Sequence, residues 1–268
     1  IKDIDKQYED LNFIYTDYQE LDICDLDQVD VFFKSNQKID YCINCAAYTA
    51  VDKAETDVDK AFEINATGAK NLAIVCSEQG VILIHISTDF VFDGQKTEPY
   101  NETDIPNPIN VYGASKLKGE VEIQKTLKEY FIVRSSWLYS EHGNNFMKTM
   151  LKLAETRDEI SVVSDQIGTP TYAGDLAKFL IEIITSSSNN FGVYHYSNLG
   201  ETSWCGFAKA ILESYEHATS VIPISSSQHP TAAIRPKYSV LNIKKAKEVF
   251  NIQPPNWEIS LKKVIKNI

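Results

Sequence analysis

The chain has 268 residues, of which 43% are hydrophobic and 24% charged, a composition typical of a globular protein that buries a large core. Its net charge of -11 argues against nucleic acid and against an anionic membrane as the main partner, because both repel an acidic surface. No apolar run approaches the ~20 residues of a membrane-spanning helix.

In the first half of the chain, short apolar runs alternate with longer helical stretches. Strands are predicted over 12–15, 40–45, 81–86 and 131–135, and helices over 25–33, over 57–79 and around Tyr112. Asp25 is a suitable N-cap for its helix, and Gly80 a suitable C-terminal stop. The run 81–86 (VILIHI) is almost wholly apolar, as expected for a strand covered on both faces of a parallel sheet. This order predicts an α/β fold with a doubly wound, parallel Rossmann-type sheet.

After about Tyr139 the alternation is less regular. A helix over 173–185, a short strand in GVYHYSN, a helix from Thr202 and an amphipathic C-terminal helix (WEISLKKVIKNI) suggest a smaller, interleaved lobe. We predict a dinucleotide-binding Rossmann domain over 1–140, with part of 170–197 returning to it. We predict a C-terminal substrate-binding lobe over 141–169 and 198–268.

The five cysteines include a CxxC at Cys42 and Cys45. The motif lies in a predicted strand, where residues three apart point to opposite faces. A redox CxxC belongs instead at the start of a helix, where the thiolate is stabilised. We therefore predict buried, reduced core cysteines and a cytoplasmic protein.

A dinucleotide-binding sheet normally opens with a strand and a Gly-rich turn that holds the pyrophosphate. No G-x-G-x-x-G or G-x-x-G-x-x-G occurs in the sequence, which begins like the tail of a helix leading into a second strand. Either the first strand and loop are missing from the chain, or it binds no dinucleotide. The motifs that follow favour the first alternative.

Polar and small residues follow two of the predicted strands at the sheet edge where ligands of such folds bind. Ala46, Ala47, Tyr48 and Thr49 come after one strand, and the two alanines would let a flat ligand approach the backbone. The S-T-D of 87–89 follows another and places hydroxyls and a carboxylate at its end.

The stretch VYGASK places Tyr112 and Lys116 four residues apart at the start of a predicted helix, hence on one face. A free tyrosine has a pKa near ~10, and a nearby ammonium group would lower it toward the working range of a proton donor. Thr88 could hydrogen-bond the same substrate oxygen. Alone, the Tyr–Lys spacing is an ordinary surface pair, but the two neighbouring motifs favour a catalytic site.

These stretches resemble the extended short-chain dehydrogenases/reductases that modify nucleotide sugars, and within them the dTDP-4-dehydrorhamnose reductase family. The resemblance extends in order along nearly the whole chain. The segments that carry it are INCAAYTAVDKAE, INATGAKNLA, HISTDFVFDG, NPINVYGASKLKGE, RSSWLY, GNNFMKTML, SDQIGTPTYAGDLA and RPKYSVLN.

The resemblance implies an oxidoreductase that uses NADPH or NADH to reduce the C4 ketone of dTDP-4-dehydro-L-rhamnose. It implies a catalytic triad of Thr88, Tyr112 and Lys116, in which Tyr112 protonates the ketone oxygen. It implies substrate contacts by Thr88, Asp89 and Trp137, although Asp89 could only cap a turn and Trp137 could be core. The cofactor site that it implies contains Asp22, Ile23, Ala46, Ala47, Tyr48, Thr49, Ile86, Tyr112 and Lys116.

Several points stay open at this stage. The family's magnesium site uses an acidic residue in the missing segment, so magnesium is possible but cannot be assigned. Asp17 could bind a ribose 2′-hydroxyl and favour NADH. Asn65 is expected to be a structural hydrogen-bonding residue of its helix. Arg235 could meet the nucleotide diphosphate or form a surface ion pair.

Other functions are also possible. A related dehydratase would need a T-D-E sequence, but Phe90 stands in place of the second acid. A regulatory binding subunit, such as that of methionine adenosyltransferase, could retain the Tyr and Lys, and another nucleotide-sugar reductase or epimerase is a further alternative. Besides the small-molecule substrate, a second copy of the chain in a homodimer is a possible partner.

Overall fold

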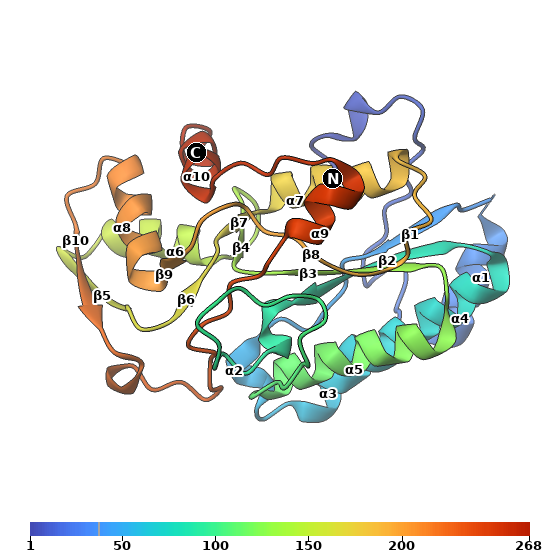
Figure 1. The fold of residues 1–268 in the computed structure, drawn as a ribbon, viewed down its shortest axis with the longest axis horizontal. Helices are drawn as coiled ribbons and strands as arrows, with labels where there is room; N and C mark the ends of the chain where they lie inside the picture. The colour runs from blue at the N-terminus through green and yellow to red at the C-terminus, as the bar shows by residue number, and fades with distance from the viewer. Residues whose placement is uncertain (37) are drawn as a thin grey trace.

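A four-stranded parallel sheet lies at the centre of the computed structural model, which describes residues 1–36 and 38–268 (Figure 1). Its strands, in spatial order, are β1 (Tyr41–Asn44), β2 (Ile82–Thr88), β3 (Tyr130–Ser135) and β8 (Gly192–His195). Every neighbouring pair is parallel. Their carboxyl ends therefore meet at one edge of the sheet, where ligands of such folds bind.

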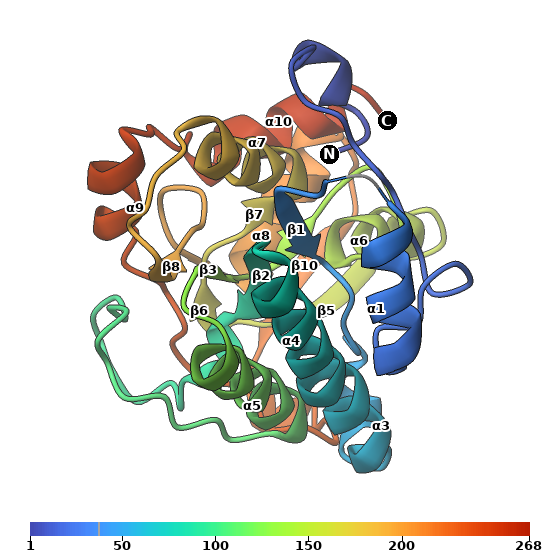
Figure 2. The same cartoon turned by 90° about the vertical axis from the view of Figure 1, so that its right-hand side faces the viewer.

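Helices cover both faces of this sheet (Figure 2). One face packs against α1 (Leu26–Ser35), α4 (Ala69–Gln79) and α5 (Val111–Thr126), and the other against α7 (Ala173–Thr185) and α9 (Lys244–Phe250). Alternate strand residues enter the two cores, because successive strand side chains point to opposite faces: Leu83 joins the first core and Ile84 the second. The predicted doubly wound α/β fold is confirmed.

The predicted helix over 57–79 consists of three pieces. α3 (Val58–Phe62) leads into the π-helical segment η2 (Glu63–Gly68), which leads into α4. Gly80 ends α4 with a φ of 67°, in the left-handed region that glycine adopts without strain, so the predicted stop is confirmed. The N-cap prediction at Asp25 is also confirmed, because its side chain accepts a hydrogen bond from the backbone of Gln28.

The strand predicted over 12–15 is wrong. No described residue pairs with this segment as a strand; instead the rings of Phe13 and Tyr15 stack with centroids 6.0 Å apart, and the Tyr15 hydroxyl donates to Asp5. An apolar run becomes a strand only where a neighbouring strand completes its hydrogen bonds, and none lies alongside here. The short 3-10 helix η1 (Asp5–Gln7) precedes it.

A separate core lies beyond the carboxyl edge of the sheet. It is formed by α6 (Phe146–Ala154), α8 (Trp204–Ser214) and α10 (Trp257–Ile265) with the parallel pair β5 (Glu159–Val163) and β10 (Ser220–Ile224). The three helices predicted for this half of the chain are present as α7, α8 and α10, whereas α6 was not predicted. The remaining short elements are α2 (Val51–Ala54), η3 (Asp89–Val91), β4 (Leu138–Tyr139), β6 (Ile167–Gly168), β7 (Thr171–Tyr172), β9 (Thr202–Ser203) and η4 (Ser226–Gln228).

The predicted domain boundaries stay predictions. Within the predicted lobe segment 198–268, α9 packs on the sheet through Ala246 and Phe250, whereas α8 and α10 belong to the separate core. Over the described ranges, 1–36 and 38–268, no helix is long and apolar enough to cross a membrane.

All five cysteines are free, but the expectation that they are all buried is wrong. Cys76 and Cys205 are buried, Cys24 and Cys42 are partly buried, and Cys45 is exposed. β1 ends at Asn44, so Cys45 already lies in the loop beyond the strand and leaves the core.

Candidate active site

Thr88 and Asp89 lie at the carboxyl end of β2, as predicted, and both are buried. The Thr88 hydroxyl donates to Asp89 Oδ1 over 3.1 Å and accepts the backbone N–H of Phe90 over 3.2 Å, which caps η3. Ser87 points the other way and donates to Glu120. Only one of the two neighbouring hydroxyls therefore belongs to the site.

The start of α5 brings Tyr112 to the same place. Asn110 caps the helix by accepting the backbone N–H of Gly113 over 2.7 Å. A side chain at Gly113 would meet the carbonyl oxygen of Phe90 at 2.1 Å, so only glycine allows the helix to approach the turn after β2 this closely. The Tyr112 ring packs edge-on against Phe90 with centroids 5.9 Å apart. The sequence-based reasoning missed Gly113, whose central place in VYGASK was the available signal.

The electrostatic surroundings of Tyr112 differ from the prediction. Burial raises its pKa to about 12, the hydroxyl of Thr88 lowers it in part, and the Asp89 carboxylate raises it further. The predicted lowering of this pKa by Lys116 is thus wrong for the protein without ligands. At neutral pH Tyr112 is a phenol, which is the form that can donate a proton.

Lys116 lies one turn further along α5 and is only 2% exposed. Its Nζ donates to the carbonyl oxygen of Ile86 over 2.6 Å and lies 3.2 Å from His85 Nε2. Burial lowers the Lys116 pKa to about 8, while Glu120 and Cys45 act in the opposite direction. The lysine is therefore directed toward β2, with a pKa close to neutral.

Asp89 is the most unusual carboxyl group of the site. It is 2% exposed, and its Oδ2 has no hydrogen-bond partner in the described part of the chain. Burial raises its pKa to about 7, although the nearby hydroxyls of Ser239 and Thr88 lower it in part. A buried acceptor without a partner is costly unless a ligand satisfies it.

The loop after β1 contains Ala46, Ala47, Tyr48 and Thr49, and Asn65 holds it in place. Asn65 Oδ1 accepts the Tyr48 backbone N–H over 2.8 Å, and its Nδ2 donates to the Tyr48 carbonyl over 3.1 Å and to Ser115 over 2.9 Å. Asn65 was expected to be a structural hydrogen-bonding residue of its helix, and its hydrogen bonds join this loop to α5. It belongs to the π-helical turn η2, which periodicity does not reveal.

Asp22 and Ile23 lie on a segment held by the same helical stretch. Asn71 Nδ2 donates to the carbonyl oxygens of Ile23 and Cys24, over 3.0 Å in each case. A side chain at Gly68 would meet Ile23 at 2.6 Å, so this segment also lies close against η2. Two of the predicted cofactor segments are thus anchored to η2 and α4.

These residues fit a nicotinamide dinucleotide. Ala46 and Thr49 are exposed beyond β1, so a flat ligand can reach the backbone there. Lys116 Nζ uses one N–H on Ile86 and has a further one for a ribose hydroxyl. For a metal the result is different: residues 1–36 and 38–268 contain no group of three or more His, Cys, Asp or Glu side chains that could hold one.

Trp137 lies in a different environment from the other predicted substrate residues. It adopts a φ of 47°, an uncommon backbone conformation for a bulky residue. Its ring stacks on Trp204 with centroids 3.6 Å apart and lies against Gly168, where any side chain would clash. These contacts join Trp137 to the core of α6, α8 and α10.

Two further predicted contacts have protein partners. Arg235 forms a two-pronged ion pair with Asp52, over 2.6 and 3.0 Å, which is the ion-pair alternative considered above. Asp17 Oδ1 accepts the backbone N–H of Gln19 in an exposed turn. Its role toward a ribose stays a prediction, and the strand on which that role was placed is not formed.

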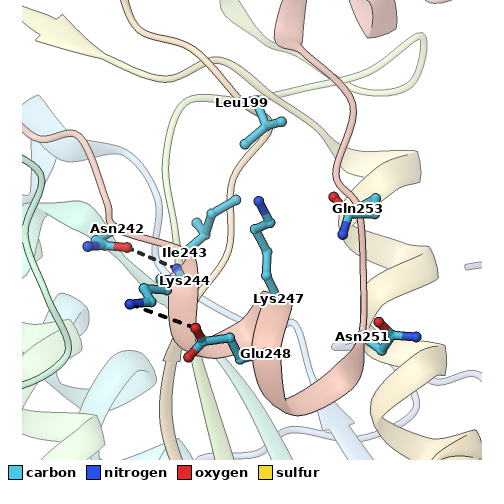
Figure 3. A pocket seen from close by; sticks show the side chains of 8 residues that line it. All are labelled: Leu199, Asn242, Ile243, Lys244, Lys247, Glu248, Asn251 and Gln253. Carbon is cyan, nitrogen blue, oxygen red and sulfur yellow. Dashed lines mark hydrogen bonds and ion pairs between the residues drawn. The ribbon is translucent and has the colours of Figure 1, made fainter.

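A cavity between α9 and the loop at Leu199 is lined by residues from outside this set (Figure 3). Its lining is Leu199, Asn242, Ile243, Lys244, Lys247, Glu248, Asn251 and Gln253. α9 and α5 lie on opposite faces of the sheet (Figure 2). This cavity is thus separate from the Tyr112 site.

The family model of the RmlD substrate binding domain matches residues 3–268. The dTDP-4-dehydrorhamnose reductase of Aggregatibacter actinomycetemcomitans is 42% identical over 258 residues, which cover 92% of this chain and 87% of that protein. This chain belongs to the dTDP-4-dehydrorhamnose reductase family. The spore coat polysaccharide biosynthesis protein SpsK of Bacillus subtilis is 43% identical to this chain, and the match covers 85% of this chain and 79% of SpsK.

Solved structures of dTDP-4-dehydrorhamnose reductases have the same fold as this chain. The enzyme of Bacillus anthracis in complex with NADP has a TM-score of 0.92 and 42% identity, covering 98% of this chain and 95% of that one. The Clostridium acetobutylicum enzyme has a TM-score of 0.94 and 41% identity, covering 99% and 94%. The resemblance found in the sequence and its Rossmann-like fold are therefore confirmed.

Proposed function

We propose that this chain is an NADPH-dependent oxidoreductase that reduces the C4 ketone of dTDP-4-dehydro-L-rhamnose to give dTDP-L-rhamnose. The product would serve the biosynthesis of cell-surface polysaccharides. The relatives named above support the reaction, and the NADP in the Bacillus anthracis enzyme supports the cofactor. The observation that carries the proposal is the gathering of Thr88, Asp89 and Tyr112 at the end of β2, with Lys116 behind them.

The proposed roles follow from the protonation states. When bound, the nicotinamide supplies the hydride for the carbonyl carbon. Tyr112 holds its Oη proton at neutral pH, since its pKa is about 12, and gives it to the ketone oxygen. The Thr88 hydroxyl lies beside Tyr112, and it hydrogen-bonds the same oxygen by turning its single O–H from Asp89 Oδ1 to the substrate. Asp89 Oδ2, which has no partner within the described residues, accepts a hydroxyl of the sugar.

The cofactor-binding residues proposed here are those that the resemblance implied. Lys116 donates its further N–H to a ribose hydroxyl, and Asn65 supports the cofactor by fixing the loop after β1. The set is Asp22, Ile23, Ala46, Ala47, Tyr48, Thr49, Ile86, Tyr112 and Lys116.

The sugar is proposed to lie between the sheet edge and the core of α6, α8 and α10. Trp137 is the proposed sugar contact from that side. Its strained backbone supports a role beyond packing, because such conformations persist where the surroundings hold them and cluster at functional sites. Residues 141–169 and 198–268 remain the proposed substrate-binding lobe.

The test is Tyr112→Phe in the full-length enzyme, assayed by NADPH oxidation with dTDP-4-dehydro-L-rhamnose. Removing a general acid should lower kcat by about 100-fold or more, while the Kd for NADPH stays near that of the wild type. The matched control is Tyr196→Phe, which removes another buried hydroxyl, one that donates to the backbone carbonyl oxygen of Asp175. The control should lose stability but keep its activity.

Two outcomes would count against the proposal. Wild-type turnover in Tyr112→Phe would remove Tyr112 from the catalytic role. A wild-type protein that binds NADPH but never oxidises it with this substrate would instead favour the binding-subunit alternative.

A further inference from the structure

The segment 231–235, called the crossing segment below, joins the lobe of β5 and β10 to the sheet side of the molecule. It follows η4 in the chain and passes beside α2 before the chain reaches α9 (Figure 1). It forms neither helix nor strand, so its backbone groups need partners outside regular secondary structure. The position of the crossing segment therefore depends on the side chains that hold it.

Asp52 holds the crossing segment from α2. Its Oδ1 accepts the backbone N–H of Ala233 over 3.1 Å and Arg235 Nη1 over 3.0 Å, and its Oδ2 accepts Arg235 Nη2 over 2.6 Å. The Arg235 guanidinium holds the pKa of Asp52 below its usual range, so the group is a carboxylate at neutral pH. One carboxylate thus binds both the main chain and a side chain of the segment.

Asn110 holds the same segment from the start of the helix that carries the proposed proton donor. Its Nδ2 donates to the carbonyl oxygen of Ile234 over 2.8 Å, while its Oδ1 caps α5. The end of α2 is joined to this helix too, because Glu55 Oε1 accepts the backbone N–H of Val111 over 2.9 Å. The crossing segment, α2 and the start of α5 therefore meet at one junction.

This junction lies between the two proposed ligands. On the cofactor side, Asp52 belongs to α2, which follows the loop that contains Thr49. On the substrate side, the chain continues from the crossing segment to Ser239, whose hydroxyl lies near Asp89. The same stretch of chain is thus in contact with the cofactor side through Asp52 and with the substrate side through Ser239.

The ion pair at the junction can open. The side chains of Arg235 and Asp52 are 22% and 46% exposed, whereas those of the buried pair Arg134 and Glu120 are 4% and 1% exposed. Ion pairs that reach water contribute little net stability, because water competes for both charges. Such a contact holds a segment without fixing it, so a bound ligand can shift the balance between a held and a released segment.

We propose that Asp52 is a positioning residue, which with Arg235 latches the crossing segment to the cofactor side and so couples the binding of the dinucleotide to that of the nucleotide sugar. The inference rests on the proposed function for the identity of the two ligands. A dinucleotide that orders the loop after β1 also orders α2 and, through Asp52, the crossing segment. Less ordering then remains when the nucleotide sugar binds, so this ligand binds more tightly, and by linkage the effect is reciprocal.

The first measurement tests the latch without any ligand. Hydrogen exchange of the Ala233 amide, followed by NMR of the full-length ¹⁵N-alanine-labelled protein and assigned with Ala233→Ser, reports whether its bond to Asp52 is formed. Ala233 is fully buried, so water does not replace the lost acceptor while the segment stays in place. Asp52→Ala should therefore speed the exchange by about tenfold, as expected for the loss of a hydrogen bond to a charged group.

The matched control is Asp104→Ala. The Asp104 carboxylate also accepts a backbone N–H, that of Asn101 over 2.7 Å, and pairs with Lys96 over 2.7 Å. These contacts close a single loop and do not reach the crossing segment. Asp104→Ala should therefore leave the Ala233 exchange at the rate of the wild type.

The second measurement tests the coupling by titration calorimetry. NADPH and dTDP-L-rhamnose do not react with each other, so the Kd of the sugar nucleotide can be measured with and without saturating NADPH. In the wild type and in Asp104→Ala, NADPH should lower this Kd by about fivefold or more. In Asp52→Ala the ratio of the two Kd values should approach one. A residue that only stabilises the fold would weaken both ligands without changing this ratio.

A second substitution tests whether the two side chains act as one contact. Arg235→Gln removes the guanidinium and keeps a polar side chain, and it should also reduce the Kd ratio. The double variant Asp52→Ala/Arg235→Gln should lose no more coupling than Asp52→Ala, because the second change removes a contact that is already broken. Additive losses would show that the two residues act separately, which contradicts the latch.

Three further results would overturn the inference. They are equal Ala233 exchange in the wild type and Asp52→Ala, a Kd ratio near one in the wild type, and a ratio that Asp52→Ala leaves unchanged or that Asp104→Ala reduces equally. A wild-type chain that binds neither ligand would instead contradict the proposed function. The exchange of Ala233 needs no ligand, so it would still test the latch in that chain.

Discussion

Two buried histidines lie on the same sheet and face basic side chains, but their hydrogen bonds run in opposite directions. His195 on β8 places Nδ1 3.0 Å from the carbonyl oxygen of Tyr100 and Nε2 3.4 Å from Arg134. A carbonyl only accepts, so Nδ1 carries the proton and Nε2 accepts from the guanidinium. His85 on β2 faces Asn44 Nδ2 with its Nδ1 over 3.0 Å, because Asn44 Oδ1 accepts from Ala46. Nδ1 therefore accepts, and the proton lies on Nε2, which is 3.2 Å from Lys116 Nζ.

The charged groups near the two histidines also differ, because those near His195 are paired and those near His85 are not. Arg134 is paired with the buried Glu120 over 2.6 Å, and Glu120 also accepts from Ser87, so this cluster satisfies its own charges. At the end of β2, Lys116 has no described carboxylate in an ion pair, and Asp89 has an oxygen without a described partner. A paired cluster supports the fold, whereas shifted and unpaired groups gather where a ligand completes them.

The largest expected effect is on stability at the paired cluster. Glu120→Gln leaves the Arg134 guanidinium buried without a counter-charge, which should lower the free energy of unfolding by about 3–5 kcal/mol. Urea denaturation measures this. Glu248→Gln, at the exposed pair with Lys244, is the matched control and should give no measurable change. If Glu120→Gln loses no more stability than Glu248→Gln, the buried Arg134–Glu120 pair is worth no more than an exposed pair. The contrast between this cluster and the end of β2 would then be wrong.

The next effect is a pH dependence at the unpaired end of β2. The pKa of Asp89 is raised from 3.8 to about 7, so the folded protein holds this proton more tightly than the unfolded chain. The resulting stabilisation is fully present below about pH 4 and is lost as the pH rises through about 7. Asp89→Asn should remove this loss, which is on the order of 4 kcal/mol, because each pKa unit corresponds to about 1.4 kcal/mol. Denaturation curves from pH 4 to pH 8 measure the free energy of unfolding of the wild type and of Asp89→Asn. If it changes equally with pH in both proteins, Asp89 is already ionised at low pH and the prediction is wrong.

The smallest expected effect concerns His195 itself. His195→Gln should lower the free energy of unfolding by about 1–2 kcal/mol, since one buried hydrogen bond is lost or weakened. Activity and its pH dependence should stay unchanged, because no predicted site residue contacts this ring. Thermal melts beside a pH profile measure both. A shifted profile would show that the two histidine sites are coupled through Arg134 and Glu120.

The sequence was informative wherever the pattern is local. Strand and helix periodicity indicated the parallel sheet, and the S-T-D and VYGASK motifs indicated the groups that lie together at its edge. The strand over 12–15 was mispredicted because pairing depends on a neighbour, which an apolar run does not specify. The pKa of Tyr112 was mispredicted in direction because burial and Asp89 outweigh a lysine that is turned toward Ile86 and His85. Both errors concern long-range contacts.

The π-helical turn η2 also bears on which insertions and deletions the fold tolerates. Each residue of an α-helix turns the chain by about 100°, so deleting one of the η2 residues 66–68 would rotate Asn65 relative to Asn71. Asn65 holds the loop after β1, and Asn71 holds the segment at Ile23. One such deletion would therefore detach one of the two proposed cofactor segments while all of the side chains named here are still present. Sequence length across η2 is thus as strong a constraint on the site as the identity of the residues in it.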